Sequence, residues 1–129
     1  MKNIKLILQV LFVSLAIISC TKEDAINGVK VKFYNETGSK IEKLNIGTKE
    51  IGVLDINATT NYIIYEEFGF DTGMPDENCS GNINEEPLKS YNTFYWCGTE
   101  KTQVEEGIYE MSLKLVEVNS VKYLSIDLK

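Results

Sequence analysis

The sequence predicts an all-β domain, folded as an antiparallel β-sandwich of about seven or eight strands and preceded by a signal peptide. Apolar and polar residues alternate in several short runs, which is the period of a strand with one buried face. Turn-forming residues separate these runs at intervals of about ten residues, as in small sandwiches. After residue 20, apolar residues do not recur at helical spacing over three turns, so the pattern predicts no helix in the domain.

The first 19 residues have the pattern of a secretion signal. Lys2 and Lys5 give the segment a basic head, and residues 6–18 follow as an almost wholly apolar run. This run of about 13 residues is too short to span a membrane, because a helix needs about 20 residues to cross roughly 30 Å of hydrocarbon. We therefore expect residues 1–19 to be a cleaved leader.

The apolar run ends in Ile17, Ile18, Ser19 and Cys20. This order resembles the lipobox of bacterial lipoproteins, in which the cysteine thiol receives a diacylglyceryl group and the leader is cut before it. The resemblance implies that Cys20 is lipidated and that the mature protein is anchored to a membrane, since several acyl chains together bind almost permanently. The alternatives are an ordinary secretion signal with a chance cysteine, or an uncleaved anchor.

Residues 20–28 are polar and carry no apolar periodicity, so we expect a lipidated tether. Within it, Lys22, Glu23 and Asp24 resemble the export signal that sends lipoproteins of the Bacteroidota to the outer face of the outer membrane. The resemblance implies a surface-exposed position on the outer membrane, with its periplasmic face as the alternative.

Residues 29–129 are expected to form a single domain, and its first half contains four predicted strands. In the first strand, Val29, Val31 and Phe33 alternate with residues of the opposite face, and turn chemistry follows at residues 35–38. The later strands of this half are rich in β-branched and aromatic residues. They cover residues 41–46, 51–54 and 62–65.

The second half of the domain begins with its least regular stretch, residues 70–90. An aromatic strand is predicted at residues 91–96, and Gly107 opens the clearest alternation in the chain. A turn at Asn119 and Ser120, followed by alternation over residues 123–128, predicts a closing hairpin.

These strands are typical of an immunoglobulin-like or transthyretin-like sandwich, with a small barrel as a weaker alternative. Residues 107–113 resemble the closing strands of the carboxypeptidase-regulatory, transthyretin-like sandwiches of secreted bacterial proteins. The resemblance covers only a small part of the chain, uses a generic motif, and bears on the fold alone.

Cys79 and Cys97 are expected to form a disulfide, because an exported chain passes through an oxidising compartment where two cysteines of one small domain usually pair. The closed loop of about 18 residues is worth roughly 3 kcal/mol in the chain-entropy model. A redox pair or a thiolate metal site would need CxxC spacing or further ligands, which the sequence lacks.

The composition excludes several classes of function. The chain has 13 basic and 19 acidic residues, a formal charge of −6, no histidine, and lysine as its only basic residue. Without histidine, neither the Ser-His-Asp and Cys-His nucleophilic systems nor histidine-ligated zinc and copper sites can be assembled. The negative charge and the missing arginine argue against nucleic acid as a partner.

Hydrolysis by paired carboxylates is the remaining enzymatic alternative, because acidic residues are plentiful. A catalytic acid needs a pocket that raises its pKa, and a sandwich of this size rarely builds a deep one. We therefore expect a protein without enzymatic activity and without a cofactor.

The candidate binding surface combines an acidic loop with aromatic residues nearby. Asp71, Asp76 and Glu77 lie in the loop, and Tyr91 and Tyr95 lie in the aromatic run that follows. Exposed aromatic rings stack on sugars or anchor protein partners, so we expect binding of a protein or a glycan. Alternatives are an accessory subunit of an outer-membrane complex that docks through a flat face, a Ca²⁺ site in the acidic loop, and a loop that is merely solvated.

Overall fold

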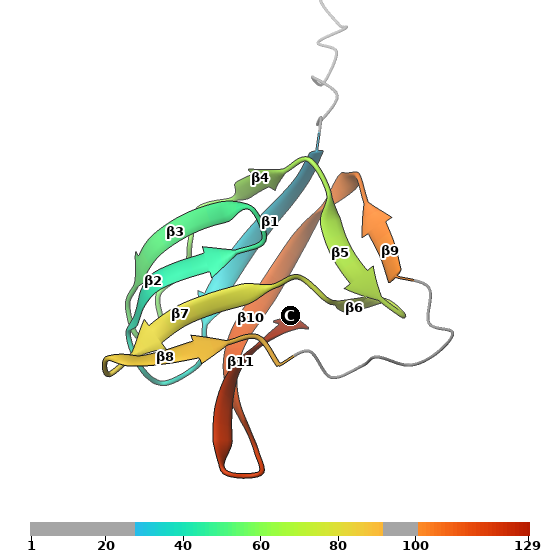
Figure 1. Ribbon diagram of the computed structural model, residues 1–129. Coiled ribbons are helices and arrows are strands. Elements are labelled where there is room, and N and C mark those ends of the chain that lie inside the picture. Colours follow the sequence, from blue (N-terminus) through green and yellow to red (C-terminus); the bar gives the residue numbers. More distant parts are fainter. Residues whose placement is uncertain (1–27, 92–100) are drawn as a thin grey trace, which may run out of the picture.

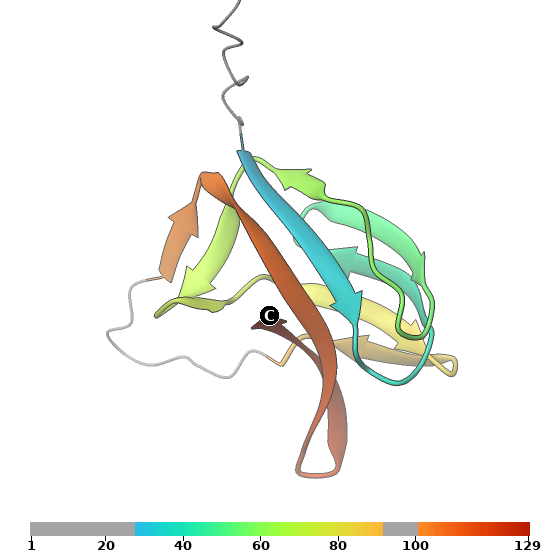
Figure 2. The same ribbon diagram turned by 180° about the vertical axis from the view of Figure 1, so that it is seen from behind.

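Eleven strands in three sheets make up the computed structural model, which describes residues 28–91 and 101–129. The first sheet has the strand order β11-β10-β1-β4, the second β3-β2-β7-β8 and the third β6-β5-β9. Figure 1 and Figure 2 show the first two sheets as facing layers, with the third beside them. The strands are β1 (Gly28–Asn35), β2 (Ile41–Ile46), β3 (Lys49–Leu54), β4 (Ile63–Tyr65), β5 (Phe68–Asp71), β6 (Met74–Pro75), β7 (Cys79–Ile83), β8 (Glu86–Lys89), β9 (Lys101–Val104), β10 (Glu106–Val118) and β11 (Val121–Leu128).

The all-β, sandwich-like prediction is confirmed, and the described residues contain more strands than the seven or eight expected. In β1, Val29, Val31 and Phe33 are fully buried, while the residues between them are partly exposed. Alternation in the sequence therefore identified both the strand and its inner face.

The closing hairpin is also confirmed. β10 and β11 pair antiparallel from Met111 opposite Leu128 to Val118 opposite Val121. Asn119 and Ser120 both have positive φ, 51° and 63°, as a two-residue type I′ turn requires. This turn matches the right-handed twist of the strands, and it therefore fixes their register.

One strand pair differs from the expected antiparallel arrangement. β1 runs parallel to β10 along its whole length, from Gly28 beside Glu106 to Asn35 beside Leu113. The other named strand pairs are antiparallel. Parallel neighbours need a long connection, and in this chain the connection contains β4 and the whole of the second and third sheets.

The expectation that residues 70–90 form the least regular stretch is wrong. β7 and β8 form a hairpin across Asn84 and Glu85, which both have positive φ, and β7 also pairs with β2. These strands are short and include Gly81 and Pro87, two residue types that are depleted in strands, so their alternation is weak. Of the aromatic strand predicted at residues 91–96, only Tyr91 lies within the described residues.

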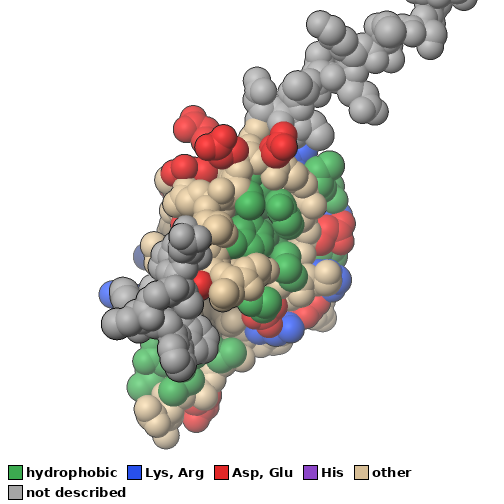
Figure 3. Space-filling model, turned by 90° about the vertical axis from the view of Figure 1, so that its right-hand side faces the viewer, with side chains coloured by type: hydrophobic (Ala, Val, Ile, Leu, Met, Phe, Trp, Pro, Cys, Tyr) green, Lys and Arg blue, Asp and Glu red, His purple; other side chains and the backbone are tan. Residues whose placement is uncertain are grey.

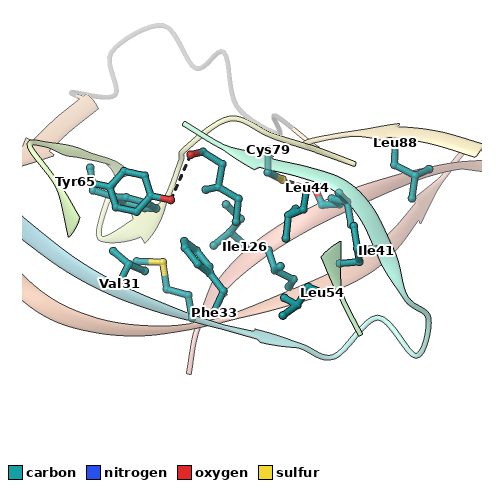
Figure 4. Packing of buried hydrophobic residues seen from close by; sticks show 14 of the residues in the cluster. Val31, Phe33, Ile41, Leu44, Leu54, Tyr65, Cys79, Leu88 and Ile126 are labelled. Atoms are coloured by element: carbon teal, nitrogen blue, oxygen red, sulfur yellow. Dashed lines mark hydrogen bonds between the residues drawn. The ribbon is translucent and has the colours of Figure 1, made fainter. Parts of the chain in front are cut away.

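One hydrophobic core joins the three sheets (Figure 4). Phe33, Tyr65 and Phe68 pack together near its centre, with ring centroids 5.2–6.4 Å apart. Tyr65 is 2% exposed, and its hydroxyl donates a hydrogen bond of 3.3 Å to the Ile46 carbonyl oxygen, so its polar atom is satisfied inside the core. Burying each such side chain contributes about 1.5–3 kcal/mol, and this packing fixes β5 relative to the first sheet.

Within the described residues, no helix has the length and apolar character that crossing a membrane would require.

Candidate functional site

An acidic cleft of about 210 Å³ lies between the edge of β11 and the segment that connects β5 to β7. The segment after β5 contributes Asp71, Asp76 and Glu77 to the lining, β11 contributes Asp127, and Tyr91 also lines the cleft. Among the residues that the structure describes, none that lines the cleft is basic.

Asp71 is fixed at the turn between β5 and β6. Its side chain accepts a hydrogen bond of 3.2 Å from the Thr72 hydroxyl, and the residue is only 9% exposed. Thr72 and Gly73 both have positive φ, 48° and 82°, which produces the tight turn. The turn thus fixes the position of one carboxylate in the lining of the cleft.

Glu77 holds the same wall in place. Its Oε2 accepts a hydrogen bond of 3.1 Å from the Gly69 N–H, and its Oε1 accepts one of 3.1 Å from the Asn78 N–H. The Asp76 N–H in turn donates a 2.9 Å bond to the Gly69 carbonyl oxygen. The segment that carries Asp76 and Glu77 is therefore fastened to β5.

Asp127 is placed by the alternation of β11. Its Oδ1 accepts a hydrogen bond of 2.9 Å from the Ser125 hydroxyl, and its Oδ2 lies 3.0 Å from Lys114 Nζ. The carboxylate of Asp127 raises the pKa of Lys114. This ion pair offsets part of the negative charge at the rim, although Lys114 itself is not among the described residues that line the cleft.

Tyr91 is anchored against β11. Its backbone N–H donates a 2.9 Å hydrogen bond to the Leu124 carbonyl oxygen, and its ring lies 5.2 Å from the ring of Tyr123 at an interplanar angle of 52°. The structure therefore brings Tyr91 together with Asp71, Asp76 and Glu77, all four of them residues of the predicted binding surface. The fifth, Tyr95, lies outside the described residues.

Sequence reasoning missed Asp127. The alternation over residues 123–128 indicated which face of its strand it would occupy, but it gave no signal that this strand borders the acidic loop. Only the contact between β11 and β6 shows that.

Among residues 28–91 and 101–129, no group of three acidic, thiol or imidazole side chains could hold a metal ion. Ca²⁺ takes six to eight oxygen ligands. The described part of the chain therefore gives no support to the Ca²⁺ alternative for the acidic loop.

Cys79 is buried at the start of β7, and the residues that the structure describes contain no disulfide. Its Sγ contacts the Leu124 carbonyl oxygen at 3.9 Å, and burial, with a smaller effect of Glu77, raises its pKa to about 12. The expected partner Cys97 and the expected lipidation site Cys20 both lie outside the described residues, so the disulfide and the lipid anchor stay predictions.

A second group of polar residues, absent from the sequence predictions, lies on the outer face of the first sheet. Tyr34 and Tyr62 donate hydrogen bonds of 2.8 and 3.1 Å to the two carboxylate oxygens of Glu110. These bonds lower the pKa of Glu110 and raise the pKa of both tyrosines. Lys32 Nζ lies 5.5 and 5.6 Å from the two ring centroids, a cation–π distance. These contacts lie across a sheet face rather than around a hollow, so we place the candidate site at the acidic cleft.

No protein-family model, curated protein or solved structure matches this chain.

Proposed function

We propose that the chain is a lipid-anchored protein of the cell envelope, without enzymatic activity, that binds a basic segment of a partner protein in the acidic cleft. The observation that carries this proposal is that Asp71, Asp76, Glu77 and Asp127 line one cleft, and that none of the described residues lining it is basic. Carboxylates form charge-assisted hydrogen bonds with lysine and arginine side chains, and a cleft of one sign attracts the opposite charge.

The size of the cleft favours an amino-acid side chain over a free small molecule. Its volume of about 210 Å³ is below the roughly 300–1,000 Å³ of typical ligand pockets. A glycan platform would be expected to present two coplanar rings, whereas the rings of Tyr91 and Tyr123 are inclined at 52°. A protein partner is therefore favoured over a glycan.

The anchor is proposed from Ile17, Ile18, Ser19 and Cys20, which resemble a lipobox. β1 begins at Gly28, so a tether over residues 20–28 reaches at most about 30 Å. Four exposed glutamates flank this end of the domain, and Figure 3 shows acidic side chains where the chain enters it. They are Glu66, Glu67, Glu105 and Glu106. Anionic headgroups would repel this end, which favours a domain that stands off the membrane and meets another protein.

The anchor is tested by intact-mass measurement and protease shaving of native cells, comparing wild type with Cys20→Ala. An acylated wild-type protein that begins at Cys20 and is shaved from intact cells supports the surface anchor. An acylated but protected protein supports the periplasmic face and the role of an accessory subunit. An unlipidated wild-type mass contradicts the anchor.

The acidic cleft is tested with a fluorescent hexalysine peptide and the chain from Thr21 onward, which contains the whole described core. Asp76→Asn combined with Asp127→Asn should weaken binding about five- to tenfold, because each exposed ion pair contributes about 0.2–1 kcal/mol. The matched control, Glu50→Gln with Glu86→Gln, removes two exposed charges on the second sheet and should change binding less than about twofold. Equal weakening in both double variants would mean that net charge alone attracts the peptide, and it would refute the cleft as the site.

A further inference from the structure

The hairpin of β10 and β11 projects from the body of the domain as a two-stranded arm, which we define as residues 114–123. β10 continues to Val118, but β1 pairs with it only as far as Leu113. The Glu36 N–H donates a 2.9 Å bond to the Leu113 carbonyl oxygen at the point where this pairing ends. Figure 1 and Figure 2 show the arm extending beyond the other strands.

Beyond Lys114, one face of the arm is apolar. Val118 lies opposite Val121, and Val116 lies opposite Tyr123. Residues directly opposite in an antiparallel pair share a face, as do residues two apart in a strand, so these four side chains form one surface. Val121 is 50% exposed, and the other three are half-buried.

This apolar face requires an explanation because a lone two-stranded ribbon has little stability in water. Exposed β-branched residues on an unprotected ribbon promote pairing with another chain. Proteins usually retain such a surface where a partner covers it. Figure 3 shows hydrophobic side chains on this projecting part of the molecule.

The apolar face of the arm is continuous with the acidic cleft. Tyr123 belongs to the arm, and its ring contacts Tyr91, which lines the cleft. Along β11, Asp127 in the cleft and Val121 in the arm are six residues apart, which corresponds to about 20 Å of extended chain. A ligand that occupied both parts would span about six or seven extended residues.

We propose that the arm and the acidic cleft form one binding surface, and that its occupant is an extended segment of a partner protein with basic residues at one end and apolar residues at the other. This inference rests on the proposed function, in which the cleft binds a basic segment. Charge complementarity favours this occupant, because four carboxylates line the cleft and none of the lining residues that the structure describes is basic.

A second copy of the chain fits this surface less well. The chain carries a formal charge of −6, so each copy would bring its own acidic cleft against the other. The arm offers Lys114 and Lys122, and Lys114 is already paired with Asp127. A partner protein is therefore favoured over a second copy of the chain, and the experiment below distinguishes the two.

The test uses two labelled peptides of equal charge, Lys-Lys-Ser-Val-Tyr-Val and Lys-Lys-Ser-Ser-Gln-Ser, with the chain from Thr21 onward. The apolar peptide should bind about tenfold more tightly, because it covers the valines of the arm. Val116→Thr with Val121→Thr keeps β-branched shape and should bring the affinity for the apolar peptide close to that for the polar one. The control Val53→Thr, at a 59% exposed valine of β3, should leave the difference unchanged.

Three results would overturn the inference, and they separate it from the proposed function. Equal binding of both peptides, weakened by Asp76→Asn with Asp127→Asn, would refute the role of the arm and leave the cleft in place. Failure of both peptides to bind would refute the cleft and the inference together. Dimerisation in analytical ultracentrifugation that the two arm substitutions abolish would show that a second copy covers the arm.

Discussion

Asn35→Ala should lower the free energy of unfolding by about 3–5 kcal/mol, although it removes a polar side chain. Asn35 ends β1 and is only 1% exposed. Its side-chain nitrogen donates hydrogen bonds to the carbonyl oxygens of Ser39, Leu54 and Asp55 at 2.8, 3.1 and 2.9 Å. Its Oδ1 accepts bonds from the backbone N–H and the hydroxyl of Thr37, at 3.1 and 2.7 Å. One side chain thus joins the end of β1, the turn that follows and the end of β3.

The magnitude follows from what alanine would leave behind. The bond to the Leu54 carbonyl oxygen is buried, and an unsatisfied buried acceptor costs about 1–3 kcal/mol. The other contacts are partly buried, so water can replace them at a net loss of about 0.5–1.5 kcal/mol for each bond that is fully made. The Asn35 side-chain nitrogen has only two protons for three carbonyl oxygens, so these three hydrogen bonds are together weaker than three separate ones. The expected total loss of stability is therefore about 3–5 kcal/mol.

The assay is urea unfolding of the chain from Thr21 onward, followed by circular dichroism. Asn45→Ala is the matched control, because its exposed amide donates to the nearby Lys43 carbonyl oxygen, and it should cost less than about 0.5 kcal/mol. Asn35→Asp should be at least as damaging as Asn35→Ala, because a carboxylate oxygen would replace the donor among three carbonyls. A loss below about 1 kcal/mol for Asn35→Ala, equal to that of Asn45→Ala, would refute this reasoning.

Two further predictions concern titrating groups. Because Glu110 raises the pKa of Tyr34 and Tyr62, Glu110→Gln should shift tyrosinate absorbance to lower pH, and superimposable titrations would contradict the hydrogen bonds. The two hydrogen bonds lower the pKa of Glu110 from its ordinary 4.5, so the stability that they contribute is present above pH 4.5 and is lost as the pH falls through the lowered pKa. Over that acidic range, the free energy of unfolding of Glu110→Gln should therefore fall less than that of the wild type. If Cys79 and Cys97 are bridged, iodoacetamide in denaturant without reductant should label neither, and intact mass showing two labels would refute the disulfide. In the reduced folded chain, Cys79 should resist labelling near neutral pH, since burial raises its pKa to about 12.

Local alternation predicted the strands that pack a regular apolar face. β1, with its alternating valines and Phe33, and the hairpin of β10 and β11, with its turn at Asn119 and Ser120, were predictable because each pattern lies within one short segment. β7 and β8 were not, because Gly81 and Pro87 weaken their strand signal, and pairing with β2 and with each other holds them in place.

The acidic loop and Tyr91 could likewise be chosen from the sequence, because their residue types are those that bind partners. The cluster of Tyr34, Tyr62 and Glu110 could not, since it joins residues from segments far apart in the chain.

The sequence by itself determined the all-β class and the face on which each regular strand residue lies, because side-chain direction in a strand follows a period of two. Only the tertiary structure decided which strands are neighbours. It placed β1 parallel to β10, and it placed β11 beside the acidic loop so that Asp127 lines one cleft with Asp71 and Asp76. The physical reason is that contacts between distant segments depend on how whole sheets pack, and no local pattern of residues encodes that arrangement.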